Sequence, residues 1–149
     1  MPIWWRQDID LKSLNEQMCR GNMLEHLDIS FTQIGPDSIS ARMPVDWRTH
    51  QPAGILHGGA SVVLAETVGS VAANLCVDME KYACVGQEIN ANHLRSKKSG
   101  WITGTARPLH RGLRSQVWEI RIVDEDDKLI CISRLTMATV KKETPTAES

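Results

Sequence analysis

Near the N-terminus, hydrophobic residues recur at the spacing of a helix. Within residues 8–18, Leu11, Leu14 and Met18 are separated by three and four positions, so they share one helix face. Asp10 stands immediately before them and is a favourable N-cap residue. The pattern predicts a short helix that packs on the outside of a larger element.

Two extended segments follow this helix. In residues 38–45, SISARMPV, apolar and polar side chains alternate strictly, which is typical of a strand with one buried face. Residues 26–32 also read as extended, and a turn at Gly35-Pro36-Asp37 joins the two segments. A polar loop over residues 46–54 then leads to the centre of the chain.

The longest apolar run occupies the centre. From Gly58 to Val77 most residues are small or branched and apolar, and Glu66 is the one charged side chain. A helix that is apolar on nearly every side should be buried. A carboxylate inside such a helix is unfavourable unless another group compensates it or the protein uses it.

Four further strand-like segments follow in close succession, at residues 82–95, 101–109, 115–123 and 129–140. Short turns join them, so they should pair as an antiparallel sheet. The predicted fold class is α+β, a hotdog fold in which a long central helix is wrapped by a curved antiparallel sheet of about six strands. The edges of a single sheet stay open, so a dimer is expected.

Composition fits this picture of one domain. At 149 residues, with 42% hydrophobic and 23% charged residues, the chain is typical of a soluble globular protein. We assign residues 1–140 to the domain and expect the polar tail, residues 141–149, to be disordered. The formal net charge of −1 gives no overall attraction to nucleic acid or to acidic membranes.

The N-terminus lacks the apolar core of a signal peptide, and polar residues within the central run argue against a membrane span. The four cysteines are scattered and lack metal-binding spacing. We therefore expect a cytoplasmic protein with free thiols. Cys76, Cys84 and Cys131 lie in apolar or strand-like runs, where they should pack as small hydrophobes.

Candidate chemistry begins on the central helix. Glu66, Ser70 and Asn74 fall at i, i+4 and i+8, so they form a narrow polar stripe with Thr67 beside it. A carboxylate with a hydroxyl one turn further on can act as a base or a nucleophile. Two structural alternatives stay open: Glu66 pairs with an arginine, or it faces solvent at a gap between subunits.

The start of the helix offers a second candidate, His57-Gly58-Gly59. The first amides of a helix lack internal partners and carry the positive end of its dipole, so they suit a developing oxyanion. A plain tight turn is the alternative. His57 has an imidazole suited to proton transfer or to capping the helix. Gln51, in the preceding loop, could orient a substrate carbonyl or simply be solvated.

The spacing between the helix start and Glu66 bears on how an active site could be assembled. Gly58 and Glu66 are eight residues apart, which is about 12 Å along a helix axis. One carbonyl can hardly touch both within one chain. If both act on the same bond, each active site lies across a two-fold dimer interface, with two sites per dimer.

The chain resembles the hotdog-fold acyl-CoA thioesterases, most closely the branch that hydrolyses 1,4-dihydroxy-2-naphthoyl-CoA and related aryl-CoA esters. The resemblance rests on the runs MPVDWRTHQPAGILHGGASVVLAETVGSVA, VGQEINANHLR, QVWEIRI and SRLT. It implies that Glu66 is the nucleophile or general base and that the Gly58 amide polarises the thioester carbonyl. It also implies that Gln51 lies near that carbonyl, that Ser70 positions water and that His57 is the neighbouring active-site histidine.

The resemblance also implies a substrate that contains coenzyme A, no other cofactor, no metal, and a tetramer made of two hotdog dimers. Two basic clusters could hold the anionic coenzyme A, and the alternative for each is a solvated turn; they comprise Arg95, Lys97 and Lys98, and Arg107, Arg111 and Arg114. The substrate-binding candidates are Thr67, His93, Arg95, Arg114 and Ser115. For His93 a place packed in the sheet is the alternative.

Two other functions stay open on the same fold. A hotdog hydratase or dehydratase would work on a β-hydroxyacyl chain, and a non-catalytic acyl-CoA sensor would bind acyl-CoA without releasing a thiol. The acyl group and the pathway are also open. Menaquinone or phylloquinone biosynthesis, aromatic degradation and the clearing of mis-charged carriers all fit the residues.

Overall fold

The central apolar run forms one long helix, α3 (Gly58–Leu75), in the computed structural model, which describes residues 1–143. The helix starts at Gly58 because the side chain of His57 caps it, and Cys76 is its C-cap. None of the helices within residues 1–143 is both long and apolar enough to cross a bilayer.

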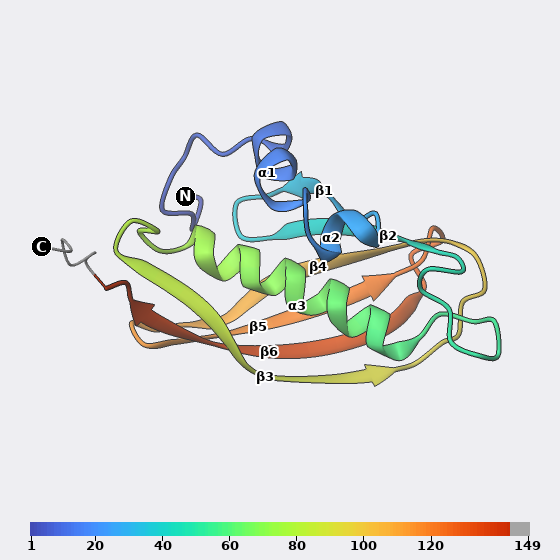
Figure 1. Cartoon of the computed structure of the whole chain (residues 1–149). Coiled ribbons are helices and arrows are strands. Elements are labelled where there is room, and N and C mark those ends of the chain that lie inside the picture. The colour runs from blue at the N-terminus through green and yellow to red at the C-terminus, as the bar shows by residue number, and fades with distance from the viewer. Residues whose placement is uncertain (144–149) are drawn as a thin grey trace, which may run out of the picture.

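One antiparallel sheet of six strands lies against α3 (Figure 1). Its strands are β1 (Ser30–Ile34), β2 (Ile39–Val45), β3 (Tyr82–His93), β4 (Gly100–Arg111), β5 (Ser115–Val123) and β6 (Leu129–Lys141). Their order across the sheet is β1-β2-β4-β5-β6-β3. The predicted α+β arrangement, a long helix against a curved antiparallel sheet, is confirmed. The strand that directly follows α3, β3, lies at the far edge of the sheet, where it pairs with β6 alone among the strands of residues 1–143.

The core lies between α3 and the face of the sheet that the helix covers. Leu64 and Val68 of the helix are fully buried there. Gly69 marks the closest approach, since a Cβ atom on it would lie 2.6 Å from Cδ2 of Leu135 on β6 and 3.3 Å from Cδ1 of Ile120 on β5. The small residues of the central run therefore let the helix sit directly on the sheet.

The N-terminal segment covers another side of α3 (Figure 1). Helix α1 (Leu11–Met18) is capped by Asp10, which accepts a hydrogen bond of 2.8 Å from Ser13 N–H, as predicted. The prediction of an extended segment over residues 26–32 is wrong at its start, because a one-turn helix, α2 (Met23–His26), precedes β1. Asn22 caps it, and four residues are too few to show helical periodicity in the sequence.

The cysteines pack as predicted. Cys84 and Cys131 are buried, Cys76 is half-buried, and all are free thiols. Burial raises the pKa of the Cys76 thiol to about 11, so this thiol is protonated and inert at neutral pH.

The C-terminal boundary lies slightly beyond the predicted one. Strand β6 continues to Lys141, and the backbone N–H of Lys142 donates to the carbonyl of Lys81 at 2.8 Å. The first residues of the predicted tail thus join the edge of the sheet beside β3. Residues 144–149, the rest of that tail, lie outside the described residues.

Candidate active site

The polar stripe of α3 faces strands β3 and β6. Asn74 Nδ2–H donates to the carbonyl of Cys84 at 3.1 Å, and Asn74 Oδ1 accepts from Cys84 N–H at 2.9 Å. Asn74 therefore binds the backbone of β3 much as a neighbouring strand would, and it ties this edge strand to the helix. Ser70 Oγ lies 3.7 Å from Sδ of Met137 on β6, a weak acceptor.

Glu66 lies against β3 one turn before Ser70 on the same stripe. A methyl group on Gly86 of β3 would overlap Oε1 of Glu66, so the glycine makes room for the carboxylate. A β-bulge between Gly86 and Glu88 adds one unpaired residue to the strand at this point, which increases the local twist. Because Gly86 and Met137 are register partners, the whole stripe lies over the outer pair of strands.

No lysine or arginine of residues 1–143 forms an ion pair with Glu66. The structural alternative of a buried Glu–Arg pair is thereby excluded for the described chain. Glu66 is half-buried, so part of it is accessible to solvent from the groove. A carboxylate in this setting retains its lone pairs for a water molecule or a bound electrophile.

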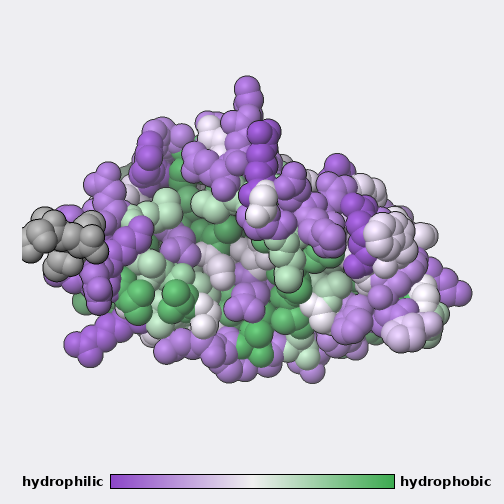
Figure 2. Space-filling view, in the orientation of Figure 1, coloured by the Kyte–Doolittle hydropathy of each residue, from purple (hydrophilic) through white to green (hydrophobic). Residues whose placement is uncertain are grey.

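Glu66, Thr67 and Ser70 line a groove of about 440 Å³. The remaining walls are apolar and come from α1, α2 and α3; they comprise Met18, Met23, Leu24, Val63 and Val71. Figure 2 shows hydrophobic surface along the middle of this face, over α3, with hydrophilic residues around it. An apolar concavity with a few polar groups at one side is typical of a small-molecule site.

At the start of α3, Nδ1 of His57 accepts a hydrogen bond of 2.7 Å from Gly59 N–H. The neutral ring therefore carries its proton on Nε2, and His57 acts as the helix cap. Within residues 1–143 no acceptor contacts Gly58 N–H. The imidazole of His93, at the end of β3, covers Gly58, since a Cβ atom on this glycine would lie 2.8 Å from His93 Nε2.

The loop that leads into α3 carries Gln51. Its side-chain oxygen accepts a hydrogen bond from Ala53 N–H, which leaves the amide N–H groups of Gln51 able to donate to another acceptor. Gln51 N–H also donates to the carbonyl of Ile55 at 2.9 Å. These bonds hold a tight turn just before the helix start, so Gln51 and Gly58 belong to one local structure.

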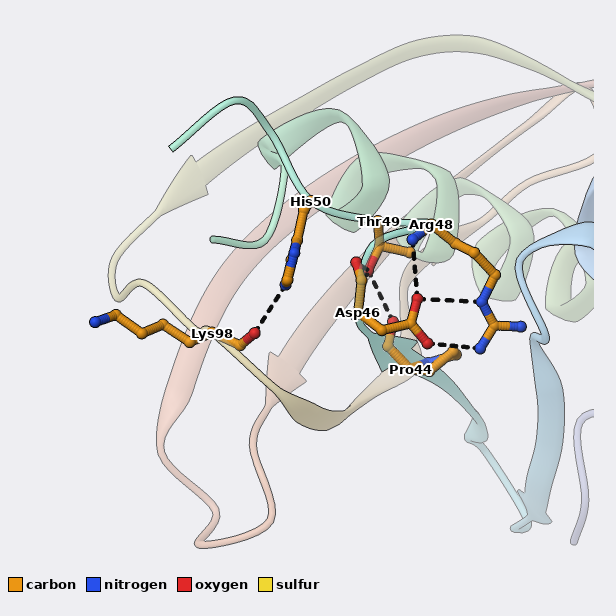
Figure 3. A network of polar contacts seen from close by, with 6 residues as sticks. All are labelled: Pro44, Asp46, Arg48, Thr49, His50 and Lys98. Atoms are coloured by element: carbon orange, nitrogen blue, oxygen red, sulfur yellow. Dashed lines mark hydrogen bonds and ion pairs between the residues drawn. The ribbon is translucent and has the colours of Figure 1, made fainter. Parts of the chain in front are cut away.

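A polar network anchors this loop (Figure 3). Thr49 is 2% exposed, and its Oγ1 donates to the carbonyl of Pro44 at 3.0 Å. Arg48 and Asp46 form an ion pair of 2.6 Å. His50 Nε2–H donates to the carbonyl of Lys98 at 2.8 Å, which ties the loop to the turn after β3.

The carbonyl of Thr49 accepts a bond of 2.8 Å from His57 N–H, so the network supports the start of α3 directly. Sequence reasoning missed Thr49 and His50 as positioning residues. Their residue types give no signal in a loop that reads as polar and solvated.

The basic candidates lie at opposite ends of β4. Arg95 follows the end of β3, near the start of α3, whereas Arg114 and Ser115 lie at the hairpin between β4 and β5. Ser115 pairs with Ala138 of β6, which in turn pairs with Val85 of β3. The structure therefore does not bring Arg95 and Arg114 together within one chain.

Two members of the basic clusters have intramolecular partners. Lys97, with a side chain 16% exposed, forms an ion pair of 2.8 Å with Glu125. The hydrogen bond from Lys97, with that from Trp101 N–H, lowers the pKa of the Glu125 carboxyl. Arg107 pairs with Asp37 at 3.1 Å. These two side chains stabilise their turns, so the remaining basic residues are better candidates for an anionic ligand.

Apart from Arg95, Arg114 and Ser115, the predicted site residues fall into two separate groups along α3. Glu66, Thr67 and Ser70 share the groove. Gly58, His57, His93 and Gln51 surround the helix start. The two groups are about 12 Å apart along α3.

Comparison with known proteins gives one consistent family. The model of the family described as the thioesterase superfamily matches residues 53–131. The chain is 56% identical over 134 residues to the 1,4-dihydroxy-2-naphthoyl-CoA hydrolase of Escherichia coli, a match covering 90% of this chain and 97% of that protein. It is 48% identical to the proofreading thioesterase EntH of Cronobacter sakazakii, covering 90% and 96% of the two chains.

Solved structures of thioesterases are also similar to this chain. A crystal structure of a mutant thioesterase from Pseudomonas aeruginosa has a TM-score of 0.90 and 51% identity, covering 94% of this chain and 99% of that one. A thioesterase from Haemophilus influenzae has a TM-score of 0.89 and 47% identity, covering 93% and 95%.

Proposed function

Because the chain belongs to the thioesterase superfamily, and is therefore a thioester-hydrolysing enzyme, we propose that its substrates are aromatic acyl-CoA thioesters. The candidate substrates are 1,4-dihydroxy-2-naphthoyl-CoA and hydroxybenzoyl-type esters. One observation carries the proposal: the Glu66 carboxylate, without an ion-pair partner in residues 1–143, lines a largely apolar groove. The similarity to a naphthoyl-CoA hydrolase supports the aromatic class and a place in menaquinone biosynthesis.

In the proposed reaction, water and the thioester give a free acid and coenzyme A. Glu66 attacks the carbonyl carbon, or it takes a proton from the water that does so. Gly58 N–H donates to the carbonyl oxygen and stabilises the negative charge that develops on it. Ser70 holds the water, and a Gln51 amide N–H orients the carbonyl. His57 contributes by capping α3, which fixes the position of Gly58.

The separation of Gly58 and Glu66 supports a site shared between two subunits. The outer edge of β3 has no strand partner within residues 1–143, and Val85 on it is exposed. An unpaired edge of this length is a ready template for another copy of the strand. Since Glu66 lies beside β3, pairing along this edge would bring the partner subunit close to the carboxylate.

Mixed dimers test the shared site. Gly58→Pro removes the proposed donor, and its backbone fits the first helical position because His57 before it is extended, with φ −70° and ψ 129°. The added Cβ also displaces the His93 imidazole, but this change affects only the helix start of the subunit that carries the substitution. Each homodimer of Gly58→Pro or Glu66→Gln should be inactive. The purified heterodimer should recover about half of the wild-type rate per dimer, because one of its two sites is intact. An inactive heterodimer would contradict the shared site.

Coenzyme A is proposed to be bound through basic side chains of both subunits. Arg95 lies near the start of α3 and Arg114 near the opposite end of β4, so one coenzyme A can meet both only across an interface. No metal and no other cofactor take part in the proposed reaction. A dimer of dimers and a cytoplasmic location complete the proposal, and sedimentation velocity of the purified protein tests the assembly.

Thiol release across an acyl-CoA panel tests the function. We expect the kcat/KM for naphthoyl- and benzoyl-type esters to exceed that for acetyl-CoA by about a hundredfold, because the groove offers apolar walls that acetyl cannot fill. Binding without thiol release would instead indicate an acyl-CoA sensor. A change in enoyl absorbance without thiol release would indicate a hydratase.

A further inference from the structure

A second cavity lies beyond the groove along α3, and one residue lines both. This cavity, of about 650 Å³, lies between the N-terminal segment and the C-terminal end of α3. Its apolar lining comprises Trp5, Ile9, Leu14, Met18, Leu75, Val77 and Met79. Met18 is the only residue that also lines the groove at Glu66, among the linings described for residues 1–143.

The two cavities follow one another along the helix. The groove contacts α3 from Val63 to Val71, and the second cavity contacts it from Leu75 onward. Val71 and Leu75 are one turn apart, which is about 6 Å along the axis. Met18 is the last residue of α1 and half-buried, so its side chain stands at the boundary between the two.

The second cavity has its own chemical character. The other half of its lining is polar or charged and comprises Arg6, Asp8, Asp10, Ser13, Gln17, Asp78 and Glu80. Hydrogen bonds from Arg6 lower the pKa of Asp8, and the backbone N–H of Ser13 lowers that of Asp10. The four carboxyl side chains of this lining outnumber its one guanidinium, Arg6, so the cavity disfavours an anionic group. An uncharged acyl chain that entered this cavity would therefore lie along its apolar side chains, away from the carboxylates.

We propose that Met18 is a specificity-determining residue that ends the acyl groove. With Met18 in place the groove takes compact acyl groups, and a smaller side chain opens it into the second cavity for long, neutral acyl chains. The thioether is unbranched and flexible, so it closes the boundary without adding polar atoms. The inference rests on the proposed function, since it assumes that the acyl group lies in the groove at Glu66.

The test is Met18→Ala, assayed by thiol release with benzoyl-CoA and with straight-chain esters from butanoyl- to dodecanoyl-CoA. We expect the ratio of kcat/KM for dodecanoyl-CoA to that for benzoyl-CoA to rise by about tenfold or more. Met18→Leu keeps most of the side-chain volume, so the same ratio of kcat/KM values should stay within about twofold of wild type. Met79→Ala is the matched control, because Met79 lines only the second cavity.

A second substitution tests whether the acyl chain of dodecanoyl-CoA enters the second cavity or whether Met18→Ala only loosens the groove. Val77 lines only the second cavity, so Val77→Trp should fill it and abolish the gain of Met18→Ala on dodecanoyl-CoA. An unchanged chain-length profile in folded Met18→Ala would overturn the inference, as would a gain that Val77→Trp leaves intact. Wild-type hydrolysis of benzoyl-CoA in the same assay tests the proposed function separately. If Met18→Ala is unfolded by circular dichroism, Met18→Val replaces it.

Discussion

Replacing Glu66 with Gln is expected to lower kcat for thioester hydrolysis by about a thousandfold, within the range that general-base groups contribute. Glutamine has nearly the same shape, so the groove stays filled, but it lacks the basic, negatively charged oxygen. Because Glu66 has no ion-pair partner in residues 1–143, the substitution breaks no salt bridge there. The loss should therefore fall on kcat, with KM and the melting temperature little changed.

Thiol release gives both kinetic constants, and circular dichroism gives the melting temperature. The control is Glu16→Gln, the same change at an exposed position of α1, which should keep wild-type kinetics. If hydrolysis by Glu66→Gln stays within a few-fold of wild type, Glu66 is neither base nor nucleophile. Such a result would leave membership of the thioesterase family intact.

Gly86→Ala is expected to lower kcat by about a hundredfold, although residue 86 bears no reactive group. The added methyl overlaps Oε1 of Glu66, and normal contact distances require the carboxylate to move by roughly 1 Å. A misplacement of this size can cost about a hundredfold in rate. Gly86 is thus a positioning residue that acts through Glu66.

The matched control is Gly104→Ala on β4, where the new Cβ meets Leu64 Cγ at an ordinary 3.4 Å; its kcat should remain near wild type. A double-mutant cycle makes the test specific. If Gly86 acts only through Glu66, then Gly86→Ala has no further effect on kcat in the Glu66→Gln background. An additive loss in the double variant would show that Gly86 acts by another route.

Much of this site could be predicted because its signals are local. His57-Gly58-Gly59 and the i, i+4, i+8 stripe are spacings along one helix, and helix geometry converts them directly into a face and a distance. Gly86 also carried a usable signal, since a glycine inside a strand marks a bulge or a close approach. The roles assigned by resemblance to Glu66 and Gly58 remain predictions until the kinetic tests are made.

Other features depended on contacts between distant segments. Met18 reads in the sequence as the last apolar residue of a short helix, and nothing local shows that it separates two cavities. Asn74 reads as the last member of a polar stripe on the central helix, and only the structure shows that its amide binds the backbone of Cys84. Lys97 reads as part of a basic cluster that could hold coenzyme A or as a solvated turn residue, yet it pairs with Glu125. In each case the partner lies far away along the chain or on another element.

By itself the sequence determined the order of the main helices and strands, the buried central helix and the position of Glu66 on it, because hydrophobic periodicity and capping act over a few neighbouring residues. Only the tertiary structure decided which strand that carboxylate faces, what lines its groove and where β3 enters the sheet. Those features arise from pairings across the sheet, between residues that the linear pattern does not connect. The position of β3 at the edge of the sheet is the clearest example, because it places Glu66 against Gly86 of that strand, next to an outer edge that has no strand partner in residues 1–143.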